Sequence, residues 1–144
     1  MPKSAVPAEV SDMLTRPNPA VIATGRPDGQ PVSVATWYLW DDGRILVNMD
    51  EGRRRLDYLR ENPRVSLTIL NGDSWYTHVS LQGHVAELLE DNDLTDIDRI
   101  AQHYIGRVYP ERSRKRISAW IDVDRWHGWG TLAGKSFTGK GSLS

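Results

Sequence analysis

The stretch VSVATWYLWDDGRILVNM, residues 32–49, decides the fold. Residues 32–40 are rich in β-branched and aromatic side chains, which predicts a strand. The tripeptide Asp41-Asp42-Gly43 is typical of a tight turn, and residues 45–49 predict the strand that follows it. Together with the apolar run at residues 20–24, these segments predict an antiparallel meander of three strands.

The flanking sequence adds further strands and a few helices. Leu56 and Leu59 lie three residues apart, which predicts a short helix from about Gly52 to Glu61 that ends before Pro63. Six short strands joined by tight turns, with too few helices for a parallel sheet, favour a mainly β protein, either a small barrel or a sandwich. The other expected elements are a weak helix over 8–14, strands over 65–70, 75–87 (bent or bulged at Gly83) and 117–123 (continued by 126–130), and an amphipathic helix over 94–105 capped by Gly106.

Composition excludes several classes of function. The chain has 144 residues, a formal net charge of −1 and no cysteine, so it has no disulfide framework, no thiol nucleophile and no cysteine-ligated metal. Its apolar runs are far shorter than the roughly 18 residues of a membrane span. The first residues, Met1 to Ser4, lack the apolar core of a secretion signal, so we expect a cytoplasmic protein.

Charge is concentrated in two short basic segments. Residues 53–64 contain five arginines, and residues 112–116 contain four further cations. Local basic patches on a nearly neutral domain favour a small anionic ligand over a long nucleic acid. Arg53, Arg54 and Arg55 fall at the first turn of the predicted helix, where the helix dipole disfavours cations unless an anion binds there. The sequence leaves two interpretations open, a phosphate or carboxylate site and a solvated charged face.

Other kinds of site find little support. His78 and His84 are about 20 Å apart along one strand at about 3.3 Å per residue, so no metal site is expected. No serine has the glycine neighbours of a nucleophile elbow, and no phosphate-binding glycine loop is present. Trp37 and Trp40 have opposite parity on their strand, so at least one leaves the barrel interior for an interface or a ring-shaped ligand.

The order of these motifs resembles the pyridoxamine 5′-phosphate oxidase-like superfamily from about residue 6 to residue 130. Within it, the chain is most similar to the B group of flavin/deazaflavin oxidoreductases, whose members commonly use coenzyme F420. The resemblance implies a six-stranded antiparallel split β-barrel over residues 1–130, followed by a Gly/Ser/Lys-rich tail, 131–144, that is mobile or held by a partner. It also implies a homodimer with cofactor sites at the interface. The segments that carry it are AVIAT at 20–24, PDGQP at 27–31, WYLWDDGRI at 37–45, RRRLDYL at 53–59, NPRVSL at 62–67, GHVAE at 83–87 and YIG at 104–106.

The resemblance also implies a set of cofactor-binding residues. Hydride transfer from reduced F420 to a conjugated small-molecule substrate needs no nucleophilic side chain, because the hydride chemistry belongs to the cofactor. A proton donor could be Tyr38, Tyr76, His78 or water. The expected cofactor-binding residues are Thr36 and Trp37 beside the ring, Asn48 and Met49 at a strand end, Arg53 and Arg55 on the phosphate, Arg54 on the phosphate or in solvent, Trp75 before the long strand, and His127 and Trp129, which reach the cofactor of the other subunit.

The sequence departs from the pattern of FMN-binding oxidases. Those proteins carry Ser-x-Lys where this chain has Arg53-Arg54-Arg55, and they carry a charged strand where residues 32–37 have no charge. The departures favour the deazaflavin branch. The alternatives are an FMN-binding oxidase or flavin reductase of the same fold, and a non-catalytic protein that binds a cofactor or haem.

Overall fold

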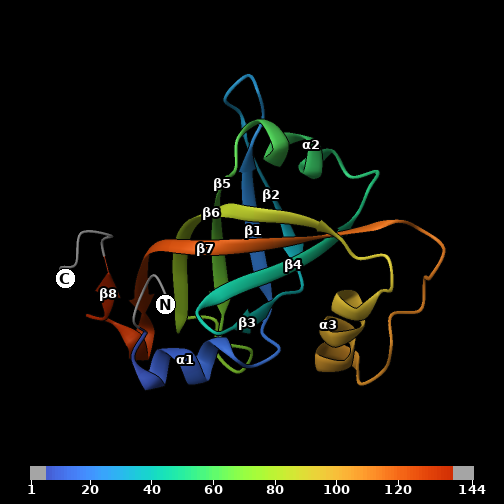
Figure 1. Ribbon diagram of the computed structural model, residues 1–144. Helices are drawn as coiled ribbons and strands as arrows, with labels where there is room; N and C mark the ends of the chain where they lie inside the picture. Colours follow the sequence, from blue (N-terminus) through green and yellow to red (C-terminus); the bar gives the residue numbers. More distant parts are fainter. Residues whose placement is uncertain (1–5, 138–144) are drawn as a thin grey trace.

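The fold is a strongly curved antiparallel sheet with helices on its outside (Figure 1). The computed structural model describes residues 6–137, so the last part of the expected tail, residues 138–144, lies outside the described residues. Within the described part, no helix is long and apolar enough to cross a membrane. The elements are α1 (Ala8–Leu14), β1 (Ala20–Gly25), β2 (Pro31–Thr36), β3 (Leu39–Asp41), β4 (Arg44–Asp50), α2 (Arg54–Glu61), β5 (Arg64–Leu70), β6 (His78–Glu90), α3 (Thr95–Ile105), β7 (Arg116–Trp129), the 3-10 helix η1 (Gly130–Leu132) and β8 (Ser136–Phe137).

The strands follow the order β2-β1-β5-β6-β7-β4-β3, with β8 paired to β7. The two end strands, β2 and β3, are consecutive in the chain and are joined by Trp37 and Tyr38. The sheet therefore curls until its ends meet at this dipeptide, which gives a barrel that is split between β2 and β3. The predicted mainly β, split-barrel class is confirmed, with eight described strands instead of six.

The predicted three-stranded meander is wrong in its last step. The strand expected over residues 32–40 is two strands, of which β2 pairs with β1 and β3 pairs with β4. The break occurs because Tyr38 turns into the core, where it is fully buried and its hydroxyl donates to the Leu14 carbonyl at 2.7 Å. Asn18 Nδ2 donates to the same hydroxyl at 3.3 Å, so the chain is fixed where the barrel closes.

The core fills the barrel with alternate residues of each strand. Along β5 the pattern is strictly alternating, with Val65, Leu67 and Ile69 buried. Ile45 and Ile121, on the paired strands β4 and β7, are fully buried in the same cluster. Each such side chain contributes about 1.5–3 kcal/mol on burial, so the core holds the strands that carry the site.

The long strands β6 and β7 pair along almost their whole length, with register shifts at Gln82/Gly83 and at Val85/Glu87. The predicted irregularity at Gly83 is confirmed, because a Cβ atom there would lie 2.1 Å from the Asp122 carbonyl oxygen. The predicted start of this strand at Trp75 is wrong. Trp75 lies in the turn before β6 and is exposed, because the chain turns between Asn71 and Thr77, where Asn71 N–H donates to the Thr77 carbonyl.

Two elements close the fold around β7. Helix α3 contacts β7, and its last turn ends at Gly106, whose φ of 72° confirms the predicted cap. After β7, the chain folds back so that Leu132 is buried and β8 pairs with Trp126 and His127. The first residues of the expected tail are thus attached to β7.

Candidate functional site

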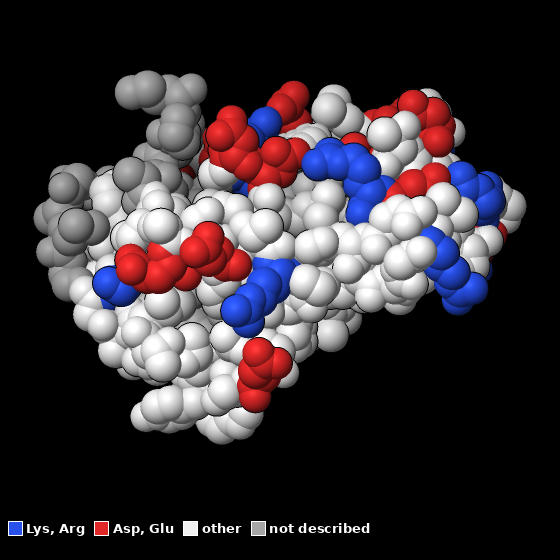
Figure 2. All heavy atoms as spheres, turned by 90° about the horizontal axis from the view of Figure 1, so that it is seen from below, with Lys and Arg blue, Asp and Glu red and all other residues white. Residues whose placement is uncertain are grey.

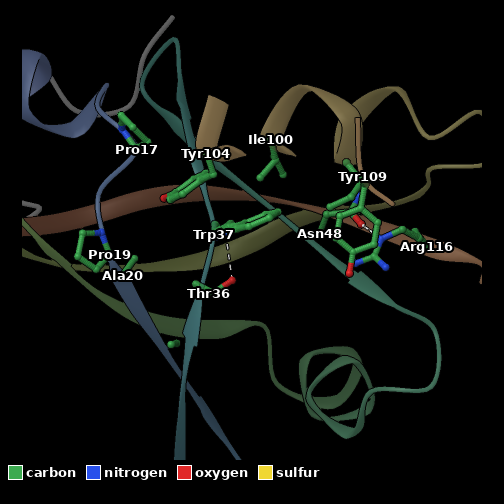
Figure 3. Close-up of a pocket in the computed structure, with 12 residues that line it drawn as sticks. Pro17, Pro19, Ala20, Thr36, Trp37, Asn48, Ile100, Tyr104, Tyr109 and Arg116 are labelled. Atoms are coloured by element: carbon green, nitrogen blue, oxygen red, sulfur yellow. Dashed lines mark hydrogen bonds between the residues drawn. The ribbon is translucent and has the colours of Figure 1, made fainter. Parts of the chain in front are cut away.

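A pocket of about 580 Å³ lies between the end of β2, the facing ends of β4 and β7, and helix α3 (Figure 3). One side is aromatic, since Trp37 stacks on Tyr104 with ring centroids 5.2 Å apart and planes 14° apart. Tyr109 meets Trp37 edge-on at 6.3 Å. The lining residues include Pro17, Pro19, Ala20, Thr36, Trp37, Asn48, Ile100, Tyr104, Tyr109 and Arg116.

Tyr104 holds the aromatic wall in place. Its hydroxyl donates to the Asn18 carbonyl at 2.7 Å and accepts from the Tyr38 backbone N–H at 3.4 Å. Burial raises the pKa of Tyr104 to about 12, so the phenol stays protonated at neutral pH and the hydrogen bond to Asn18 is kept. The ring that supports Trp37 is therefore held through its hydroxyl by two backbone groups.

The opposite end of the pocket is polar and built on β4 and β7. Asn48 and Ser118 are partners in the β4–β7 ladder, and Asn48 Nδ2 donates to Ser118 Oγ and to Asp91 Oδ2, each at 3.1 Å. Asn48 Oδ1 accepts from Arg116 Nε at 2.7 Å. Because a charged acceptor lies on one side of the amide and a charged donor on the other, its orientation is determined. The Arg116 guanidinium also lies over the Tyr109 ring at 4.6 Å.

The two basic segments of the sequence meet at the end of β4. Arg114 Nη1 lies 3.2 Å from Asp50 Oδ2, and Arg53 Nε lies 3.8 Å from the same oxygen. Lys115 Nζ lies 3.5 Å from Glu51 Oε2. A group of cations separated by some sixty residues in the chain therefore surrounds two carboxylates just before α2.

Arg55 differs from its two neighbours. Arg54 is exposed, and Arg53 is largely exposed beside Asp50, whereas Arg55 is partly buried. The Nε atom of Arg55 is buried, and no described residue accepts a hydrogen bond from it. Burial lowers the pKa of Arg55, and the like charge of Arg53 lowers it further while Asp50 opposes this. Buried donors are normally satisfied, so this one points to an acceptor that the chain does not supply.

The start of α2 offers more free donors next to this arginine. The N-cap residue is Arg53, and no side chain caps the first turn; the N–H of Leu56 already donates to the Arg53 carbonyl at 3.1 Å, which leaves the N–H groups of Arg54 and Arg55. A helix start without a side-chain cap, beside a guanidinium whose Nε is buried and unpartnered, is suited to an anion such as a phosphate. The predicted conflict between cations and helix dipole is thus present in the structure.

Met49 and the aromatic residues of the last strand lie elsewhere. Met49 is almost fully buried in the core, so its side chain supports β4 from inside the barrel. His127 and Trp129 are in contact at the far end of β7, with ring centroids 4.6 Å apart. Asp50 pairs with Arg116 at the start of β7, so about 40 Å of strand separates Trp129 from the start of α2. One chain does not bring these two groups together.

The candidate proton donors are also removed from the pocket. Tyr38 is fully buried, and burial raises its pKa above the ordinary value while its hydroxyl donates to a backbone carbonyl. Tyr76 is exposed, and His78 stacks on Trp129 at 5.9 Å at the far end of the sheet. Among residues 6–137, no group of three histidine or acidic residues could hold a metal ion.

Residues 6–130 match the model of the family described as pyridoxamine 5′-phosphate oxidase. The chain belongs to this family. Solved structures with the same fold include an F420 reductase (24% identity, 84% of this chain and 98% of that one, TM-score 0.77) and a conserved hypothetical protein of Mycobacterium tuberculosis (26%, 88% and 85%, 0.68). A third is a pyridoxamine 5′-phosphate oxidase-related, FMN-binding protein of Nostoc punctiforme (14% identity, 88% of this chain and 85% of that one, TM-score 0.64). No curated protein sequence matches the chain.

The family is described as an oxidase, and two of these structural neighbours are described as an F420 reductase and as an FMN-binding protein. Both kinds of cofactor carry a planar ring and a phosphate group. The structure offers one feature for each, an aromatic-lined pocket and, outside the residues that line it, the buried and unpartnered Nε of Arg55 at a helix start without a side-chain cap. The residues present therefore fit a cofactor of this type.

Three polar or aromatic residues of the pocket were missed as site residues from the sequence. Tyr104 stood in one of the family-like segments and Arg116 in the second basic segment, but neither was assigned to the site. Tyr109 carried no signal at all. Their common position depends on α3 and on the β4–β7 ladder, which brings Asn48 next to Ser118 and Arg116.

Proposed function

We propose that this protein is an oxidoreductase that uses the deazaflavin coenzyme F420 to reduce a conjugated organic substrate. The observation that carries the proposal is the buried Nε of Arg55, which lacks an acceptor beside the uncapped start of α2. When bound, the cofactor supplies hydride transfer. The chain's own residues bind it, orient it and exclude water.

The expected binding residues form two sets, one that holds the phosphate of the cofactor and one that borders its ring. Arg55 and the first-turn N–H groups of α2 hold the phosphate, and Arg53 adds charge from the N-cap position. Thr36 and Trp37 border the ring, and Asn48 lines the same pocket. Met49 supports the site indirectly, because its side chain packs in the core beneath β4.

An excess of cations favours F420 over FMN. A single phosphate needs Arg55 and the helix start, yet Arg54 is exposed, and Arg53 and Arg114, which share the one carboxylate of Asp50, have side chains that are about two-thirds exposed. Cations that are left in solvent around a phosphate site suit the longer anionic tail of the deazaflavin. FMN, with its shorter tail, would leave them unused.

We further propose a homodimer in which exposed aromatic residues, at the end of β7 and in the turn before β6, cover the cofactor of the other subunit. Trp75, Tyr76 and Trp129 are 68%, 69% and 48% exposed, although aromatic side chains of this size are usually covered. Since β7 holds Trp129 far from Arg55 within one chain, a second chain is needed to bring them together. A dimer mass in sedimentation that changes to a monomer mass on Trp129→Gln would support this arrangement.

The test of the proposed function is equilibrium binding of oxidised F420 and of FMN to the purified protein, followed by quenching of tryptophan fluorescence. Tight binding of F420 and weak binding of FMN supports the proposal, and oxidation of reduced F420 by conjugated acceptors then identifies substrates. The reverse preference assigns the protein to the FMN oxidases or flavin reductases. Binding without turnover of any acceptor supports a carrier or sensor, and binding of neither cofactor overturns the proposal.

A further inference from the structure

Arg116 is a buried cation without an acidic partner. Its side chain lines the pocket beside Trp37, and the residue is 7% exposed. Its only hydrogen bond from the side chain to another described residue is the one from Nε to Asn48 Oδ1. No carboxylate of residues 6–137 lies within ion-pair distance of it. The N–H groups on its two terminal nitrogens have no acceptor among those residues, and these nitrogens keep some accessible surface, since neither is among the fully buried unpartnered atoms.

The surroundings hold the guanidinium in place and leave its charge uncompensated. The Tyr109 ring lies against one face at 4.6 Å, which attracts the cation weakly. The nearest acid in the network, Asp91, is reached only through Asn48. The Asp91 carboxylate is already occupied, because it also accepts from the backbone N–H groups of Asp96 at 3.0 Å and Ile97 at 2.9 Å.

A buried charge normally has a partner, since removing it from water is costly. The Arg116 side chain lines the pocket, where the other lining residues are aromatic or apolar apart from Thr36 and Asn48 (Figure 3). Trp37 and Tyr104 form one stacked wall, and Pro19 and Ile100 contribute apolar surface. The pocket volume of about 580 Å³ lies in the range for small-molecule sites.

We propose that Arg116 is the anion-recognising residue of this pocket, which takes a planar conjugated ring that carries a carboxylate or an ionised oxygen on its edge. The terminal nitrogens of Arg116 would form a fork on that edge, while the ring lies along Trp37. Two sources supply this chemistry, an aromatic acid as substrate and the anionic edge of the reduced cofactor ring. Naming these sources rests on the proposed function, whereas the recognition by Arg116 does not.

The test uses naphthoate as a planar anionic probe and naphthamide as its neutral counterpart. Binding to the full chain without cofactor is measured by titration calorimetry. We expect naphthoate to bind the wild-type protein at least tenfold more tightly than naphthamide. Arg116→Gln should remove this preference, and Arg116→Lys should keep part of it, because lysine retains the charge and loses the fork. Arg125→Gln is the matched control, since Arg125 is an exposed arginine on a different surface.

Two outcomes overturn the proposal. One is equal binding of naphthoate and naphthamide to the wild-type protein, a result that does not depend on any variant folding. The other is undiminished naphthoate binding by Arg116→Gln, with thermal melting used to show that the variant is folded.

A second titration identifies the source of the ligand. If saturating F420 or FMN displaces naphthoate, the cofactor ring occupies the position next to Arg116, and if both bind together, the position belongs to an acidic substrate. Either result is consistent with recognition of the anion by Arg116. Naphthoate binding that depends on Arg116, in a protein that binds neither cofactor, would overturn the proposed function and leave this inference intact.

Discussion

Replacing Arg55 with glutamine should weaken cofactor binding without weakening the fold. The buried Nε of Arg55 has no acceptor among the described residues, and Arg53 repels the guanidinium. In the unliganded protein, this arginine is therefore a source of strain and contributes little to stability. The bound phosphate is what would make the burial favourable.

The expected size of the effect follows from the bonds that are lost. A hydrogen bond to a charged group contributes about 1.5–3 kcal/mol, and about 1.4 kcal/mol corresponds to a tenfold change in affinity, so the dissociation constant should rise about 10- to 140-fold. The free energy of unfolding should stay the same or rise by up to about 1 kcal/mol, because an unsatisfied donor is removed, and the Tm should rise by at most about 3 °C.

The assay compares four proteins by fluorescence titration with F420 and by thermal melting without it. Arg54→Gln is the matched control, since Arg54 is exposed beside the same helix start. Arg55→Lys should recover part of the affinity. An affinity of Arg55→Gln within twofold of wild type, together with a Tm lowered by more than about 5 °C, would show that Arg55 is a structural residue and would refute the phosphate assignment.

Three further changes test the fold around the site. Gly83→Ala should destabilise the protein by about 3 kcal/mol in urea unfolding, since its Cβ would overlap the Asp122 carbonyl oxygen, and an unchanged midpoint would contradict the β6–β7 geometry. Asp91→Ala should cost about 2–4 kcal/mol by the same assay, because the first turn of α3 loses its acceptor and a buried amide loses its partner. The hydrogen bond from Arg112 lowers the pKa of Asp98, so the pair stabilises the fold above the unfolded-state pKa, and this contribution is lost as pH falls through the lower folded-state pKa. When the pH is lowered from about 5 into the acid range, the loss of unfolding free energy should be smaller for Arg112→Gln than for wild type.

Local sequence was sufficient for most elements and failed at barrel closure. The alternating apolar residues of β5 and the glycine at residue 83 were predictable, because strand faces and close backbone approach leave a local pattern. The break between β2 and β3 was not, because residues 32–40 are uniformly favourable for a strand. What ends β2 is the burial of Tyr38 against Leu14, a contact across 24 residues.

The sequence predicted the site only where the charged residues follow one another in the chain. Three consecutive arginines predicted an anion site at a helix start, but nothing in their order shows that Arg55 alone is partly buried. Asn48 was expected at the site, but Arg116 beside it was missed, because the two residues are 68 positions apart and meet only through the β4–β7 ladder. Charge is more evenly spread on the folded surface than along the sequence, since Figure 2 shows acidic and basic side chains interspersed on one face. A broad basic surface of the kind that follows a nucleic acid backbone is not present on that face.

Asp91 connects the stability of α3 to the position of Arg116. Its carboxylate accepts from the first-turn N–H groups of α3 and also from Asn48, which in turn accepts from Arg116. Ser118 extends the same network, because it accepts from Asn48 and donates to a carboxylate on α3. A change at any of these positions therefore alters both the helix and the pocket, so substitutions at Asp91 and Arg116 should not be additive in ligand affinity. Loss of Asp91 frees Asn48 to rotate, and Arg116 then loses the contact that orients it toward the pocket.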